Sequence, residues 1–199
     1  DPSVHRALLD HAARVPAFQA SLLDAADEDL LVQALLRPEL REAALTRPVE
    51  ALVPRLAARL PRPEAVWVLA RIGSEQAWSA ILSAGSFNSA LPQADPARLA
   101  RVALHWAADR ERGPLLARLL PARPEYADFF RAALAVPEAR AAACAAIRQL
   151  KDREAVPKLI PLLREDREVT YTLHSVTGEQ FGLDRQAWWR WWHEATRKL

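Results

Sequence analysis

The stretch of sequence that decides the fold class is residues 143–164, which read ACAAIRQLKDREAVPKLIPLLR. Its second half places Val156, Leu159, Ile160 and Leu163 at positions i, i+3, i+4 and i+7, so these apolar side chains share one face of an α-helix. Its first half is rich in alanine, the residue with the highest helix propensity. The stretch therefore predicts two short helices joined by a tight turn, each with one face to bury.

The composition of the whole chain extends this prediction to an all-α fold. Alanine and leucine dominate the 199 residues, of which 51% are hydrophobic and 26% charged, while residues that favour strands are sparse. No apolar run approaches the roughly 20 residues that a membrane-spanning helix needs. The single cysteine, Cys144, cannot form an intramolecular disulfide. These features exclude the transmembrane, fibrous and disulfide-scaffold classes.

Proline marks most of the predicted helix starts. Its fixed φ suits the first turn of a helix, where the N–H that it lacks has no partner in the helix. The prolines and the other helix-breaking residues predict a series of short helices with short links, at 3–13, 16–25, 28–36, 38–46, 48–60, 63–72, 74–84, 95–108, 110–121, 124–135, 137–149, 152–164, 166–176 and 184–197.

Two segments depart from this rhythm. Residues 85–92 read GSFNSALP, and their Gly, Ser and Asn suit turns, so we expect a loop there. Such a loop would hinge a single domain into two parts, 1–84 and 95–199. Residues 169–176 read VTYTLHSV, whose β-branched residues would suit a strand. Because no second strand is available to pair with it, we predict a helix.

Short amphipathic helices in series are typical of repeat proteins, in which each pair buries its apolar face against its neighbours. Residues 143–164 resemble the HEAT-like repeat of bacterial proteins, a kind also found in the phycobilisome lyase group, and weaker copies lie at 65–78 and 99–120. The resemblance implies a right-handed α-solenoid of helical pairs. Aligning the copies makes three residues equivalent helix N-caps, which are Ser74, Asp109 and Asp152.

The C-terminal segment carries a second resemblance. Residues 177–192 read TGEQFGLDRQAWWRWW and are similar to the closing segment of many bacterial HEAT-like repeat proteins. The similarity implies that residues 177–199 form a cap that seals the end of the solenoid. We expect Asp184 to cap the last helix and the following residues to form its buried stripe, namely Trp188, Trp191, Trp192, Ala195 and Leu199. Trp189 lies off that stripe.

Residue patterns for catalysis or metal binding are not evident in the sequence. The five histidines are scattered, with no His-Glu-x-x-His motif, no paired cysteines and no Gly-rich phosphate loop. Cys144 lies in an alanine-rich segment with nothing to stabilise a thiolate. We therefore assign no catalytic residue, metal or cofactor, and we expect that the chain is not an enzyme.

Charge is distributed unevenly along the chain. Residues 1–97 hold 9 Lys and Arg against 12 Asp and Glu, a net charge of −3, whereas residues 98–199 hold 18 against 13, a net charge of +5. We therefore expect a partner to contact the C-terminal half. The candidate contact residues are basic positions on expected second helices, together with the off-stripe tryptophan as an aromatic anchor: Arg118, Lys158, Arg164 and Trp189.

The repeat resemblance implies a noncatalytic protein–protein interaction scaffold or accessory subunit. Two alternatives stay open at this point. One is a nucleic-acid backbone-binding module resembling HEAT-like DNA glycosylases, which a pI near 9.0 permits and the interleaved acids oppose. The other is a lyase-like small-molecule enzyme, which rests on the resemblance alone. Because the sequence begins at Asp1 without Met, we expect that a preceding segment was removed, and the compartment, cytoplasmic or exported, stays open.

Overall fold

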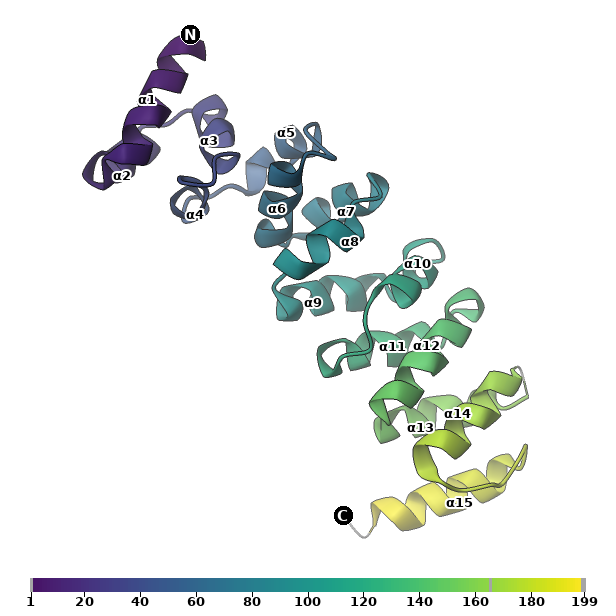
Figure 1. The fold of residues 1–199 in the computed structure, drawn as a ribbon. Coiled ribbons are helices and arrows are strands. Elements are labelled where there is room, and N and C mark those ends of the chain that lie inside the picture. Colours follow the sequence, from purple (N-terminus) through teal and green to yellow (C-terminus); the bar gives the residue numbers. More distant parts are fainter. Residues whose placement is uncertain (1, 165, 198–199) are drawn as a thin grey trace. The chain divides into compact units, whose positions relative to one another are not determined.

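The computed structural model describes residues 2–164 and 166–197, and within them every regular element is a helix (Figure 1). The predicted all-α class is confirmed. No helix in the described residues is long and apolar enough to cross a membrane. The α-helices and the 3-10 helices, labelled η, follow one another as α1 (Pro2–Arg14), α2 (Pro16–Asp24), α3 (Glu28–Leu35), α4 (Arg41–Ala44), η1 (Glu50–Leu52), α5 (Val53–Ala57), α6 (Pro63–Ile72), α7 (Glu75–Ser83), α8 (Phe87–Ala90), η2 (Leu91–Gln93), α9 (Pro96–Trp106), α10 (Arg112–Leu119), η3 (Pro124–Tyr126), α11 (Ala127–Ala133), α12 (Pro137–Leu150), η4 (Arg153–Ala155), α13 (Val156–Leu159), η5 (Ile160–Leu162), α14 (Arg167–Thr177) and α15 (Arg185–Thr196).

Most helices begin where the sequence predicts. Pro16, Pro63 and Pro137 stand in the first turns of α2, α6 and α12. The β-branched segment at 169–176 lies within α14, so the prediction of a helix there is correct. Its apolar residues Val169, Leu173 and Val176 are buried, and this burial outweighs their modest helix propensity.

Of the three predicted N-caps, Ser74 and Asp152 cap α7 and η4, whereas the N-cap of α10 is Glu111 and Asp109 stands two residues before it. The Ser74 hydroxyl accepts the Ala77 N–H at 3.2 Å, and an Asp152 carboxylate oxygen accepts the Glu154 N–H at 3.1 Å. Asp109 accepts two backbone N–H groups at the start of α10, and these bonds hold the pKa of its carboxyl below the ordinary value.

Prolines inside the predicted helices break them. The expected helix at 152–164 is divided into η4, α13 and η5, with Pro157 and Pro161 in the second and third pieces. The expected helix at 48–60 is likewise divided into η1 and α5, with Pro54 at the start of α5. A proline lacks the N–H for an i→i−4 bond and its ring crowds the preceding turn, so a tighter 3-10 turn replaces the α-helix.

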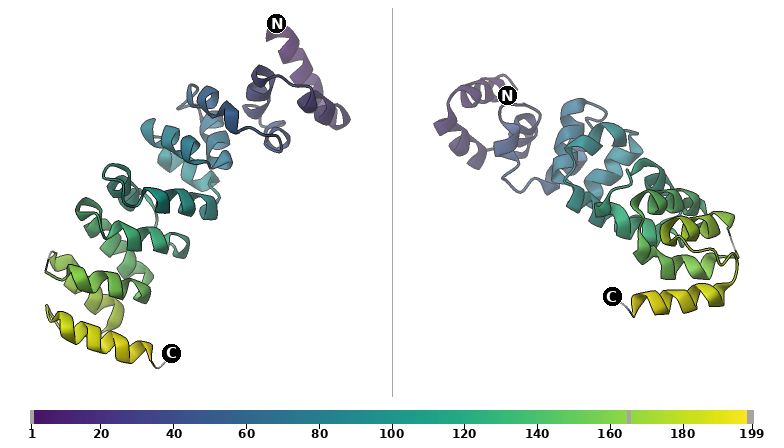
Figure 2. Two further views of the ribbon diagram at one scale, coloured as in Figure 1. Left: turned by 180° about the vertical axis from the view of Figure 1, so that it is seen from behind. Right: turned by 60° about the horizontal axis from the view of Figure 1, so that its bottom comes forward.

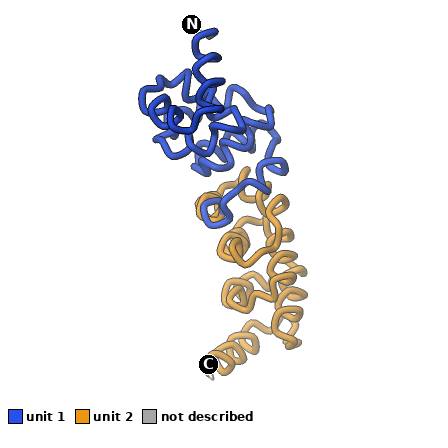
Figure 3. The backbone as a smooth tube through the Cα atoms, turned by 60° about the vertical axis from the view of Figure 1, so that its left-hand side comes forward, with its two compact units in different colours: residues 1–99 blue, residues 100–199 orange. Residues whose placement is uncertain are grey.

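The segment 85–92 is not a loop, which corrects the prediction from sequence. It contains α8 and runs into η2, because Phe87 and Ala90 are buried and the Phe87 ring packs 5.5 Å from the ring of Trp78. The two compact units of the chain are residues 1–99 and 100–199, shown in Figure 3, so the division lies within α9. We call them unit 1 and unit 2.

Within unit 1, successive helices alternate between two rows. α1 packs on α2, α3 packs on α4, and α5 packs on α6, while α2 also packs on α4 in its own row. Charged pairs join helices within a row: Asp10 to Arg37 at 2.5 Å, Asp24 to Arg47 at 2.7 Å, Asp29 to Arg55 at 2.7 Å and Glu42 to Arg71 at 3.6 Å. Arg37 also holds the pKa of the Asp10 carboxyl below its ordinary value. In every pair the acid precedes the arginine in the chain.

Unit 2 has the same two-row plan. α12 packs on α10 and α14 in one row and on α11 across the rows, and α15 packs on α13 and η5 (Figure 2). Two arginines link neighbours within a row, Arg131 of α11 to Asp152 at 2.6 Å and Arg148 of α12 to Glu168 of α14 at 2.8 Å. Here the arginine precedes the acid.

Candidate functional site

A pocket of unit 2 lies between α14 and the segment that leads to α15. Its volume is about 680 Å³, within the range of roughly 300–1,000 Å³ that is common for ligand pockets. We call it the α14 groove. It is lined by Arg167, Thr170, Tyr171, His174, Glu179, Gln180, Gly182, Leu183 and Trp188.

One wall of the α14 groove is a stripe along α14. Arg167, Thr170, Tyr171 and His174 stand at i, i+3, i+4 and i+7, so they share one helix face. The buried residues of the helix, such as Leu173, lie on the other side. The α14 helix therefore has two apolar faces. One is buried in the core of unit 2, and the other, which is partly polar, lines the groove.

The other wall is the loop that follows α14. Gly178 and Gly182 have positive φ values of 85° and 55°, which let the chain leave α14 and turn toward α15. His174 Nδ1 lies 3.0 Å from the carbonyl oxygen of Glu179, and Trp188 Nε1 donates to the carbonyl of Gly182 at 3.0 Å. The loop is thus tied to both helices and forms a defined wall.

The α14 groove combines a buried aromatic floor with exposed apolar edges. Trp188 is fully buried, and its ring meets that of Phe181 edge to face at 5.0 Å. Tyr171 and Leu183 are 59% and 61% exposed, the two highest values among the large apolar residues that the structure describes. Exposed apolar side chains gathered at one pocket mark a surface that can bury area against a ligand or a partner.

The charges beside α14 are mostly committed to contacts within the chain. Asp166 accepts the Glu168 N–H at the start of α14, and the Glu168 carboxylate is paired with Arg148. The Arg148 guanidinium also lies over the Tyr171 ring, 4.9 Å from its centroid. Arg167 is exposed and forms no ion pair with another residue of the described ranges, which leaves one cation available at the edge of the groove.

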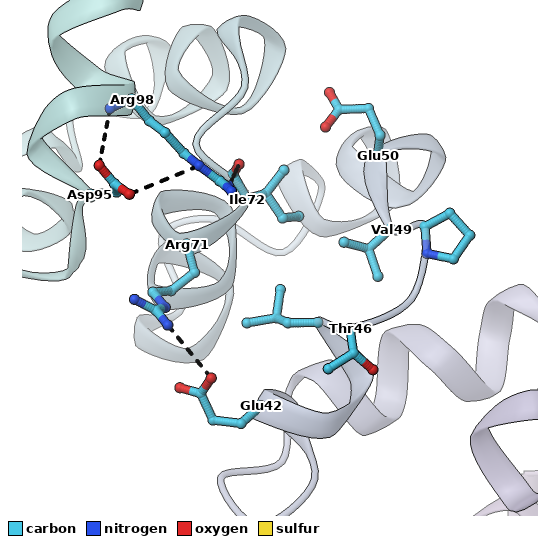
Figure 4. Close-up of a pocket in the computed structure, with 10 residues that line it drawn as sticks. Glu42, Thr46, Val49, Glu50, Arg71, Ile72, Asp95 and Arg98 are labelled. Atoms are coloured by element: carbon cyan, nitrogen blue, oxygen red, sulfur yellow. Dashed lines mark hydrogen bonds and ion pairs between the residues drawn. The ribbon is translucent and has the colours of Figure 1, made fainter. Parts of the chain in front are cut away.

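A second pocket, of about 490 Å³, lies in unit 1 and is shown in Figure 4. Arg71 reaches Glu42 across it, and the Arg98 guanidinium contacts Asp95 and donates to the carbonyl oxygen of Ile72 at 3.2 Å. Its basic groups are therefore occupied by contacts within the chain. We interpret this pocket as a junction between helices and the α14 groove as the better candidate site.

The four partner residues predicted from sequence do not share one row. Arg118 is on α10, in the row of α12 and α14, and its Nε donates to the carbonyl of Pro114 at 3.1 Å. Lys158 on α13 and Trp189 on α15 belong to neighbouring elements of the other row, and Arg164 follows η5. Arg118, Lys158 and Arg164 are exposed, whereas Trp189 is half-buried and stacks on His193 at 5.7 Å.

The C-terminal cap agrees with its prediction only in part. Asp184 accepts the N–H groups of Gln186 and Ala187 at 3.0 Å each, as expected of an N-cap. Trp188 is buried, but Trp191 and Trp192 are half-buried, because α15 has α13 and η5 on one side and packs on no later helix within the described residues. Leu199, the last expected member of the stripe, lies outside the described residues.

Metal ligation and thiol chemistry find no support in the residues that the structure describes. Among residues 2–164 and 166–197, no group of three or more His, Cys, Asp or Glu side chains is placed to hold a metal ion. Cys144 is buried in α12, and burial raises the pKa of its thiol, which disfavours a reactive thiolate at neutral pH.

Sequence reasoning missed Tyr171 and Leu183. The i, i+3, i+4, i+7 spacing of the groove stripe was present in the sequence, but the buried stripe of the same helix accounted for the apolar residues there. Leu183 carries no comparable signal, since a single leucine in a loop has no periodicity.

Comparisons of the chain with protein-family models, with curated proteins and with solved structures found no match.

Proposed function

We propose that this chain is a noncatalytic protein-binding module of the HEAT-like repeat type, built as a right-handed solenoid of helical pairs. The two-row packing within each unit supports the repeat architecture, since helices such as α2 and α12 pack against neighbours in their own row and in the other. Such arrays commonly present extended binding surfaces, which suits a scaffold or accessory subunit.

The observation that carries this proposal is the exposure of Tyr171 and Leu183 at one pocket. An apolar centre with polar groups at its edge is the usual anatomy of a protein-binding hot spot, where an anchor side chain of the partner is desolvated. Arg167, Glu179 and Gln180 supply the polar edge here.

Ion pairing within unit 2 lowers the number of cations that could bind a nucleic-acid backbone. Phosphate recognition needs arginines or lysines that are free to neutralise phosphates. In unit 2, Arg131 is engaged with Asp128, Asp152 and Glu154, and Arg148 with Glu168.

The test is quantitative affinity capture with the full chain, followed by cross-linking that locates the captured protein on its surface. We expect Tyr171→Ala combined with Leu183→Ser to lower recovery of the partner by about tenfold or more, since hot-spot truncation typically costs about 2 kcal/mol or more. The matched control is Leu115→Ser, which removes an exposed leucine of α10. A partner that is retained by the groove variant, or cross-linked elsewhere, would contradict the proposal.

A further inference from the structure

The α14 groove lies at the end of a row of helices in the described residues. In the row of α10, α12 and α14, each helix packs against the next, and α14 is the last of that row in the part of the chain that the structure describes. The loop from Gly178 to Asp184 fills only part of the space beside α14, because Tyr171 and Leu183 remain about 60% exposed. Figure 1 shows this loop running back from the end of α14 to the start of α15.

We propose that the α14 groove receives an amphipathic helix of a partner protein, which lies along α14 and extends the row. This inference rests on the proposed function and names the kind of segment that the partner supplies. A helix fits because the groove wall is itself two turns of helix. Its side chains form a ridge, and the ridge formed by residues i, i+3 and i+4 of a second helix can pack beside it. The wall residues are Arg167, Thr170, Tyr171 and His174.

The apolar anchor of the partner helix would seat between Tyr171 and Leu183, above Trp188. These three residues come from α14, the loop and α15, so one large side chain inserted there contacts all three segments. Burial of such a side chain removes apolar surface of both partners from water, which is the main favourable contribution to helix-in-groove binding.

Charge gives the groove two different ends. Arg167 stands at the first residue of α14, whereas Glu179 follows its last residue by two positions. The Glu179 carbonyl oxygen lies 3.0 Å from His174 Nδ1, and His174 stands seven residues after Arg167, so Arg167 and Glu179 lie about two helical turns apart along α14. The partner helix would therefore carry an acidic residue on the Arg167 side of its anchor and a basic residue on the Glu179 side.

Arg167 is the group on which the charge complementarity depends. Its acidic neighbours Asp166 and Glu168 are held by a backbone N–H and by Arg148, respectively. An acidic side chain of the partner would thus meet a cation that no described carboxylate neutralises, and the contact would steer and orient the helix.

The test uses the full chain and two synthetic, fluorescently labelled helical peptides, each with a tryptophan anchor, a glutamate one turn to one side of it and a lysine one turn to the other side. The two peptides have opposite sequence order, which covers both directions of docking. We expect one of them to bind in fluorescence polarisation, and Tyr171→Ala to weaken that binding by about tenfold or more. The Tyr171 side chain is exposed, so the variant should keep its fold, and circular dichroism checks this.

Charge reversal supplies the specific readout. Arg167→Glu should weaken the bound peptide by about tenfold, and replacing the glutamate of the peptide by lysine should restore binding to this variant. Arg101→Glu is the control, because it makes the same charge change at an exposed position of α9 in unit 2. The proposal is supported if the peptide with lysine in place of glutamate regains binding to the Arg167→Glu variant and gains none with the Arg101→Glu variant.

Three results would overturn the helix proposal. The first is that neither peptide binds. The second is that Tyr171→Ala and Arg167→Glu leave the peptide affinity unchanged. The third is that proline-containing versions of the peptides, which cannot form a helix, bind equally well. None of them would by itself contradict the proposed function, which fails only if a captured partner is insensitive to the paired Tyr171 and Leu183 substitutions.

Discussion

Thr170 and Thr172 stand two positions apart on α14 and have opposite environments. The Thr172 hydroxyl is fully buried, donates to the carbonyl of Glu168 at 2.7 Å and accepts from Arg148 at 2.9 Å. The buried Thr170 hydroxyl oxygen has no hydrogen-bond partner among the described residues. A buried polar atom without a partner contributes nothing to stability and has already lost its hydration.

This contrast predicts the effect of valine at the two positions. We expect Thr172→Val to lower the free energy of unfolding by about 1–3 kcal/mol, because the Arg148 guanidinium loses an acceptor. Thr170→Val should leave the free energy unchanged or raise it, since the added methyl group replaces an unsatisfied hydroxyl. Urea denaturation of the two variants measures the difference, and equal losses would show that the hydroxyls have similar environments.

The tryptophans of α15 are also ranked by the structure. Trp188→Ala removes a fully buried side chain together with its bond to Gly182, so we expect a loss of about 3–5 kcal/mol. Trp189→Ala should cost clearly less, because the side chain is half-buried and contacts His193 one turn away on the same helix. Denaturant melts provide the comparison, and a loss at Trp189 equal to that at Trp188 would reject this ranking.

At the scale of the element, sequence reasoning succeeded where the signal is local. Ser74 and Asp184 were identified as N-caps because a short polar side chain before an apolar stripe satisfies amides of its own helix. The segment 85–92 was misassigned because the decisive contact of Phe87 is with Trp78 on another helix, and turn-forming residues outnumber apolar ones there. The α14 groove was missed for the same reason, since it requires the loop around Leu183 to return beside Tyr171.

The link between α11 and η4 gives an element-scale prediction. Arg131 reaches Asp152 at 2.6 Å and Glu154 at 2.7 Å, and the Arg131 and Asp152 side chains are only 17% and 7% exposed. Arg131→Gln should lower the free energy of unfolding by about 3 kcal/mol, because it leaves the Asp152 carboxylate largely buried without its cation.

The matched control for this prediction is Arg55→Gln in unit 1. Arg55 is 46% exposed and its partner Asp29 is 69% exposed, so the loss should stay below about 1 kcal/mol. Thermal and urea unfolding of both variants test the ranking. A large loss at Arg55 together with a small one at Arg131 would contradict it.

At the scale of the whole molecule, composition predicted the fold class but not the pairing of helices. Alanine and leucine content, together with proline punctuation, indicated an all-helical chain of short elements. The contacts between helices join residues 20 or more positions apart, such as Asp29 with Arg55 or Arg148 with Glu168. Single exposed charges carry no periodic signal, so these partners emerge only from the folded structure.

The opposite order of these charged pairs in the two units also limits how the chain can be rearranged. In unit 1 a helix offers an acid to the next member of its row, and in unit 2 it offers an arginine. A helical pair duplicated within its own unit would meet a complementary neighbour at both junctions. The same pair transplanted into the other unit would set carboxylate against carboxylate at one junction and guanidinium against guanidinium at the other. Duplication of a helical pair within its unit would therefore keep the opposite-charge contacts between neighbours, whereas transfer to the other unit would replace them by like-charge contacts.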